Sequence, residues 1–133
     1  MSGQIEGRSR ELLEGKNFCG VVTIGKDGRP DVVVVWVDTD GEGVLLNSAE
    51  GRAWPESLRR DPRVTLAVAN HENPYEYVAI DGEAVEITTE GADEHIDKLA
   101  KKYLDKDEYP FRQPDEVRLL IRVRPEKVRL RGG

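Results

Sequence analysis

Hydrophobic positions along the chain follow two different periods. Alternating apolar residues or short apolar blocks predict strands over 17–25, 31–38, 44–48, 63–70, 75–88 and 116–130. Apolar residues at helical spacing predict helices over 5–16, 52–60 and 92–104. Gly82 stands where the apolar register of the fifth strand shifts, which predicts a β-bulge.

Turn-forming residues separate most of these strands, and the clearest turn contains Asp27-Gly28. Six short strands joined mainly by turns, with two or three helices between them, predict a mainly β, α+β fold built on a six-stranded antiparallel barrel. A length of 133 residues predicts one domain that spans residues 1–133.

The second predicted strand is apolar on both faces, because residues 32–37 read Val-Val-Val-Val-Trp-Val. A barrel strand with its outer face in water should alternate between apolar and polar residues. One face can fill the barrel, and the other needs a cover, for which a second copy of this small chain is the simplest source. We therefore expect a homodimer, and the alternative is a cover by one of the chain's own helices.

Composition excludes several classes of partner. The net charge of -6 argues against nucleic acid or an acidic membrane surface. No apolar run approaches the length of a membrane span, and the first residues lack a signal-peptide pattern. A single cysteine, Cys19, excludes an internal disulfide and a multi-cysteine metal site, and it reads as a small buried apolar residue. We expect a cytoplasmic protein.

A phosphate-binding pattern lies at 45–62, where an apolar strand runs through small polar residues into a helix. Asn47 and Ser48 are short hydrogen-bonding side chains, and Arg52 offers a planar charged fork just before the first helical turn. Backbone N–H groups and the dipole at a helix start favour an anion. The alternative is a solvated Arg52 that pairs with Glu50 or Glu56.

The two tryptophans allow two interpretations. Trp36 and Trp54 could stack on a flat ring, but a tryptophan in a strand is more often a core or interface residue. The sequence alone leaves both alternatives open.

Conventional catalytic groups are scarce. His71 and His95 have no partner at metal-ligand spacing, so we expect no metal site, and we expect His95 to be solvated at the edge of its helix face. Asp38 and Asp40 are expected to be surface charge. No Ser/His/Asp arrangement is present, so the pattern identifies no catalytic residue, and a phosphate-bearing cofactor would have to supply the chemistry.

The order of elements and several short motifs resemble a known superfamily. The matching pieces are residues 23–30, 35–37, 51–53, 58–64, 72–78, Gly82 and 121–128, and they span nearly the whole chain. The run Leu58-Arg59-Arg60-Asp61-Pro62 is the most specific of them. The chain resembles the split β-barrel flavin and deazaflavin oxidoreductases, which include pyridoxamine 5′-phosphate oxidase, and within them the small F420-dependent branch.

The resemblance implies a homodimer with two identical cofactor sites between the subunits. The cofactor ring would lie against the second strand, and its phosphate would lie at the following loop and helix start. The residues so implied are Val34, Val35, Trp36, Asn47, Ser48, Arg52 and Trp54. The function implied is hydride transfer from reduced F420 to a small unsaturated substrate. The alternatives are FMN as the cofactor, or a non-catalytic protein that binds a flavin or another planar ligand.

One position departs from the pattern of this branch. Members usually place a lysine that contacts the phosphate where this chain has Trp54, and the following Pro55 lacks an N–H donor. Proline is tolerated in the first helical turn, so the helix itself should form. We therefore expect a phosphate site with less positive charge than is usual in the branch.

Overall fold

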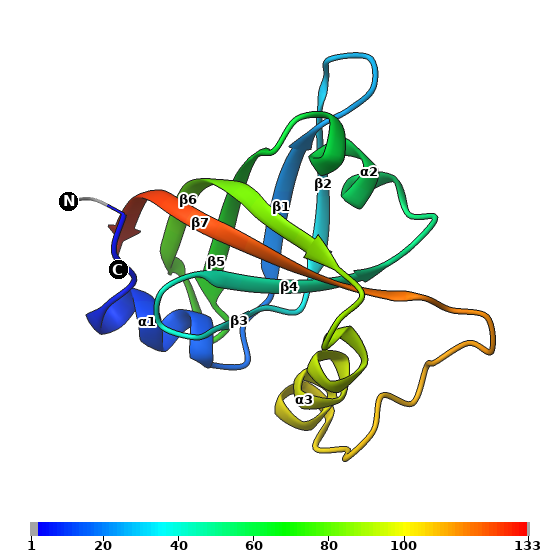
Figure 1. Ribbon diagram of the computed structural model, residues 1–133. Coiled ribbons are helices and arrows are strands. Elements are labelled where there is room, and N and C mark those ends of the chain that lie inside the picture. The colour runs from blue at the N-terminus through cyan, green and yellow to red at the C-terminus, as the bar shows by residue number, and fades with distance from the viewer. Residues whose placement is uncertain (1–2, 133) are drawn as a thin grey trace.

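The computed structural model describes residues 3–132 as three helices and seven strands (Figure 1). In chain order they are α1 (Gly7–Glu14), β1 (Cys19–Ile24), β2 (Pro30–Val35), β3 (Asp38–Thr39), β4 (Val44–Ala49), α2 (Ala53–Arg60), β5 (Arg63–Asn70), β6 (Asn73–Thr88), α3 (Ala92–Leu104) and β7 (Arg118–Arg131). The bounds of α3 are those predicted from the sequence. None of the helices within 3–132 has the length and apolar character needed to cross a membrane.

The strands form one antiparallel sheet in the order β2-β1-β5-β6-β7-β4-β3, which curls into a half-barrel (Figure 1). The mainly β, α+β prediction is confirmed. The count of six strands is wrong, because the predicted strand 31–38 is two strands. The chain leaves β2 after Val35 and, two residues later, pairs with β4 as β3.

This break explains why the sheet must curl. The strands β2 and β3 stand at opposite ends of the sheet order, yet only Trp36 and Val37 join them. Three residue steps span at most about 11 Å, so the two ends of the sheet are held close together. We call the opening between β2 and β3 the split.

Helix α3 binds the backbone of the connection across the split. The hydroxyl of Tyr103 accepts a hydrogen bond from the Val37 N–H at 3.1 Å. The Lys102 ammonium group donates to the Val37 carbonyl at 2.6 Å and to the Leu13 carbonyl at 2.8 Å. A buried connection outside the ladder needs such partners, so α3 and the split depend on each other.

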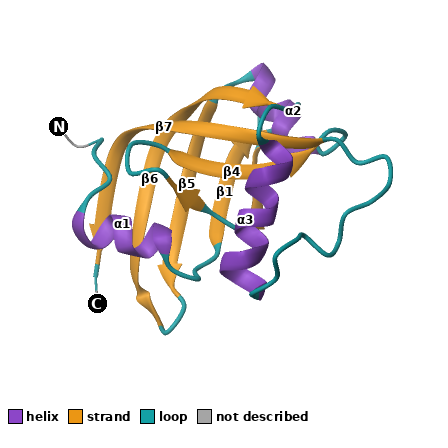
Figure 2. Cartoon of the chain, turned by 60° about the horizontal axis from the view of Figure 1, so that its bottom comes forward, coloured by secondary structure: helices purple, strands orange, loops and turns teal. Residues whose placement is uncertain are grey.

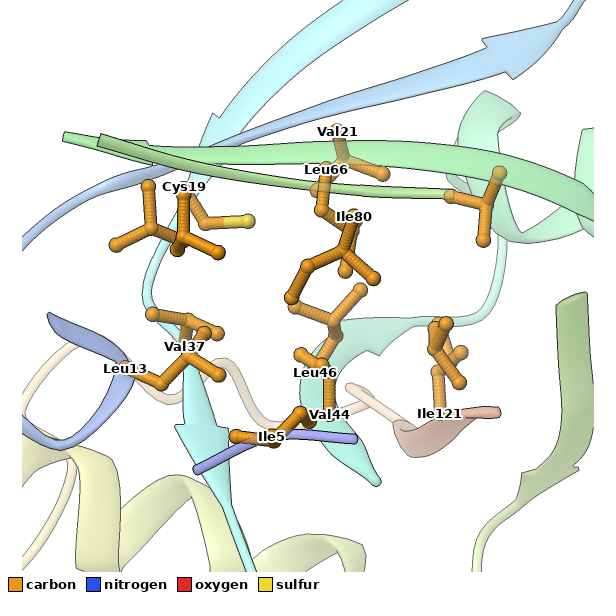
Figure 3. Packing of buried hydrophobic residues seen from close by; sticks show 14 of the residues in the cluster. Ile5, Leu13, Cys19, Val21, Val37, Val44, Leu46, Leu66, Ile80 and Ile121 are labelled. Atoms are coloured by element: carbon orange, nitrogen blue, oxygen red, sulfur yellow. The ribbon is translucent and has the colours of Figure 1, made fainter. Parts of the chain in front are cut away.

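The core lies inside the curl, between two walls of side chains that point toward one another (Figure 3). Val21, Leu66 and Ile80 come from one wall, and Leu46 and Ile121 face them from β4 and β7. Helix α1 closes one end with two fully buried leucines, Leu12 and Leu13. Cys19 is also fully buried, as predicted, and burial raises the pKa of its thiol to about 12.

The predicted bulge at Gly82 is confirmed. The register between β6 and β7 shifts between Asp81 and Gly82, and a Cβ atom at Gly82 would collide with the carbonyl oxygen of Arg124. A side chain at this position would push the two strands apart, which explains the glycine.

The edge strand β2 has one apolar face in the protein and one outside it. Val33 and Val35 are partly buried against the core, whereas Val34 is 70% exposed and Val32 is 61% exposed. The two-faced pattern predicted from the sequence is therefore present, and the chain's own helices leave the outer face uncovered.

Candidate functional site

A cavity of about 370 Å³ lies beside the split. It brings together five of the seven residues that the sequence assigned to cofactor binding, which are Val34, Val35, Trp36, Asn47 and Arg52. They come from β2, the connection after it, β4 and the start of α2. Segments separated along the chain therefore meet at one hollow, whose volume is within the range typical of small-molecule sites.

Aromatic side chains form much of the cavity wall. Four of the chain's eight aromatic residues line it, namely Phe18, Trp36, Tyr109 and Phe111. The Trp36 ring is stacked on Tyr103 of α3, with 5.1 Å between ring centroids and 5° between the planes, and Tyr109 meets Trp36 edge-on. The stack leaves Trp36 little freedom to turn, so it presents a fixed flat surface.

The loop 105–117 supplies two aromatic residues that the sequence analysis did not assign to the site. It leaves the end of α3 and returns to β7 (Figure 2). The backbone N–H of Tyr109 donates to Asp97 at 2.8 Å, and Arg112 pairs with Asp93 and Asp97, each at 2.8 Å. These contacts tie the loop to α3 and hold Tyr109 at the cavity.

The polar end of the cavity is formed by Asn47 and Arg118. Arg118 Nε donates to Asn47 Oδ1 at 2.9 Å, and the guanidinium lies over the Tyr109 ring at 5.1 Å. Arg118 is almost fully buried, and its Nη1 is 3.2 Å from a carboxylate oxygen of Glu116. Sequence reasoning missed Arg118, because the course of the loop before it has no periodicity.

His95 and Asp38 lie behind this polar end, and both contradict the sequence expectation. His95 is only 6% exposed, and its Nε2 is 3.6 Å from Asp38 Oδ2. Asp38 was expected to be surface charge, but β3 pairs with β4 at the edge of the sheet and α3 supplies its neighbours, so its side chain is largely buried. Burial raises the pKa of Asp38, but His95, the Thr39 N–H and Lys98 outweigh it and bring the pKa to about 2.

Arg52 stands at the N-cap of α2 with its side chain unengaged. Within residues 3–132 its guanidinium makes no hydrogen bond or ion pair. The alternative that it pairs with Glu50 or Glu56 is wrong, because Arg59 binds both carboxylates. Arg52 and the free N–H groups of the first helical turn are therefore available to an anion.

Ser48 and Trp54 are the two assigned residues that do not line this cavity. Ser48 is fully buried, and its hydroxyl has no hydrogen-bond partner among the described residues. Trp54 is 5% exposed and packs in the hydrophobic core. The geometry gives no support for contact between the Trp54 indole and a cofactor.

The ionisable side chains of the cavity lining are Arg52, Arg118 and Tyr109. Across residues 3–132, no group of three or more histidine, cysteine or acidic side chains is placed to hold a metal ion. The lining is suited to hold a planar molecule with anionic or carbonyl groups.

The half-barrel with a cavity at its split defines the fold class of this protein. The sequence profile of the pyridoxamine 5′-phosphate oxidase family matches residues 5–132, and the chain belongs to that family. The resemblance stated from the sequence motifs is confirmed. No curated protein is significantly similar to the chain in sequence.

Solved structures show the same fold. An F420 reductase is 26% identical, with a TM-score of 0.79, and the match covers 90% of this chain and 94% of that one. A conserved hypothetical protein from Mycobacterium tuberculosis is 20% identical, with a TM-score of 0.73 and coverage of 99% and 88%. A putative pyridoxamine 5′-phosphate oxidase from Listeria innocua is 20% identical, with a TM-score of 0.67 and coverage of 90% of each chain.

Proposed function

We propose that the chain is an F420-dependent oxidoreductase that transfers a hydride from the reduced deazaflavin to a small unsaturated substrate. One observation carries the proposal: residues expected to face the ring and a residue expected to face the phosphate line the same cavity. The similarity to an F420 reductase over nearly the full length of both chains supports the choice of cofactor.

The chemistry of the lining fits such a cofactor. Val35 and Trp36 offer an apolar and aromatic surface for a flat ring, and Arg52 offers an unpaired cation for a phosphate. The cofactor, when bound, supplies the hydride chemistry, which the few reactive side chains of the lining do not. The role of the chain is to orient the ring, to neutralise the phosphate and to exclude water from the aromatic end of the cavity.

A second copy of the chain is part of the proposal. The exposed face of β2, with Val32, Val34 and the neighbouring Phe18, is apolar and adjoins the cavity, which Val34 and Phe18 line. A homodimer that buries this face would bring a second subunit to the edge of the cofactor site. We place the protein in the cytoplasm, where its lone Cys19 would stay reduced.

FMN is the alternative cofactor, because position 54 departs from the pattern of the F420-dependent branch. Position 54 carries a buried tryptophan and no cation, so the phosphate site depends on Arg52 and backbone donors. The second alternative is a non-catalytic protein that holds a planar ligand, which the scarcity of acid–base groups in the lining favours.

Calorimetric titration of the purified protein with F420 and, separately, with FMN tests the proposal. We expect saturable binding of F420 with one cofactor per chain, and weaker or absent binding of FMN. Tighter binding of FMN would transfer the proposal to the FMN-dependent alternative. Failure of both cofactors to bind would reject an oxidoreductase of either kind.

A further inference from the structure

Behind the cavity, a row of buried side chains links three strands and a helix. Asp38 of β3 meets His95 of α3, with 3.6 Å between Oδ2 and Nε2. His95 Nδ1 is 3.1 Å from Asn47 Nδ2 on β4, and Asn47 Oδ1 is 2.9 Å from Arg118 Nε on β7. Asn47 and Arg118 line the cavity, whereas Asp38 and His95 lie outside its lining.

The order of donors and acceptors in this row is determined from the arginine end. An arginine N–H can only donate, so the Asn47 atom that faces Arg118 must be the carbonyl oxygen. The Asn47 amide nitrogen then donates to the Ala92 carbonyl at 3.0 Å and to His95 Nδ1. His95 Nδ1 must accept, which leaves the ring proton on Nε2, facing the Asp38 carboxylate.

This order also determines which hydrogen-bonding group a bound molecule must carry. Both N–H groups of Asn47 and its oxygen are engaged within the row. Apart from its bond to Asn47 and its ion pair with Glu116, the Arg118 side chain has no further hydrogen bond within residues 3–132. The unused hydrogen-bonding capacity at this end is therefore that of a donor, which suits a carbonyl or anionic oxygen.

We propose that His95 is a positioning residue, which acts through Asn47 to hold Arg118 as the donor that recognises an oxygen of the bound molecule. The part of this inference that concerns the bound molecule rests on the proposed function, but the coupling of His95 to Arg118 does not. Neither residue belongs to the set that the sequence assigned to the cofactor.

The coupling makes a specific prediction about pH. A protonated His95 carries an N–H on Nδ1, which opposes the amide N–H of Asn47 and weakens the hold of this amide on Arg118. The charged groups around the ring act in both directions: Asp38 on β3 favours protonation, and Lys98, 3.5 Å from the Asp38 carboxylate, and Arg118 beyond Asn47 oppose it.

NMR of the protein without ligand tests the coupling. The chain has two histidines, so the rings of His95 and His71 can be followed separately as the pH is lowered. We expect the Arg118 Nε–H resonance to move together with the His95 ring. The movement should persist in His71→Gln, the matched control at an exposed position, and vanish in His95→Gln. An Arg118 resonance that ignores His95 in the parent protein would overturn the proposal without reliance on any variant.

Cofactor titrations across the same pH range test whether Arg118 recognises the bound molecule. We expect F420 affinity in the parent protein to fall by roughly tenfold as His95 becomes protonated, and the same series in His95→Gln to lack this fall. Comparison of the two proteins cancels any titration of the cofactor itself. Equal pH dependence in both would overturn the positioning role and leave the oxidoreductase proposal intact. If neither F420 nor FMN binds but the Arg118 resonance still follows the His95 ring, the oxidoreductase proposal is rejected and the positioning role is retained.

Discussion

Replacement of Arg52 by alanine tests the proposed phosphate contact. The Arg52 side chain has no partner within residues 3–132, so its loss should leave the free energy of unfolding within about 0.5 kcal/mol of the parent value. A charge-assisted hydrogen bond to a phosphate is worth on the order of 1.5–3 kcal/mol. Cofactor affinity should therefore fall roughly 10- to 150-fold, as measured by calorimetric titration with F420 and with FMN.

The matched control is Arg63→Ala, which removes the same charge from an exposed arginine that pairs with Asp61 and lies outside the cavity lining. It should bind cofactor as the parent does. Cofactor binding by Arg52→Ala as tight as that of the parent would rule out the phosphate contact. An equal loss of affinity in both variants would also rule it out, because it would show only an effect of net charge.

Three further changes test the dimer, the buried Asp38 and the place of Trp54. Val34→Lys places a charge on the exposed face of β2, and light scattering of this variant should give half the mass of the parent dimer. The control Val85→Lys, at an exposed site of β6, should keep the parent mass. A parent protein that is already monomeric would contradict the dimer. The pKa of Asp38, about 2, lies below its value in an unfolded chain, so the ionised carboxylate stabilises the fold above about pH 4. The free energy of unfolding should therefore fall by about 2 kcal/mol as the pH is lowered from 4 to 2. Urea unfolding at pH 7 and 2.5 should show a smaller loss in Asp38→Asn, and an equal loss would assign the acid sensitivity elsewhere. Trp54→Lys would bury a charge in the core and should cost on the order of 3–5 kcal/mol in urea unfolding, and unchanged stability with tighter F420 binding would show that Trp54 faces the cofactor.

The sequence predicted most of the fold, because its signals were local. The amphipathic period of α3 and the register shift at Gly82 each depend on neighbouring residues, and the structure has both as predicted. The break between β2 and β3 was missed, because the run 32–37 is uniformly apolar and nothing in it marks a change of strand partner. Its cause is tertiary: Tyr103 and Lys102 of α3 bind the backbone of Val37 in place of a strand neighbour.

The candidate site was predicted only in part, because some of its residues have no local signal in the sequence. Arg52 belongs to a local phosphate-binding pattern, Val35 was implied by the family resemblance, and both line the cavity. Arg118 and Tyr109 reach it from a loop without periodicity, although two aromatic residues in a polar loop, Tyr109 and Phe111, were a usable signal. His95 was assigned to solvent from its place on the helix face, because the sequence does not show that β3 returns beside α3.

A crystal structure of the protein grown with F420 would show whether a planar, phosphate-bearing cofactor binds in the cavity at the split. We predict that the ring lies against Val35 and Trp36, with the phosphate within hydrogen-bonding distance of Arg52 and a second copy of the chain packed on β2. Cofactor bound elsewhere, such as in the cleft between the 25–31 turn and α2, with the split cavity empty, would contradict it.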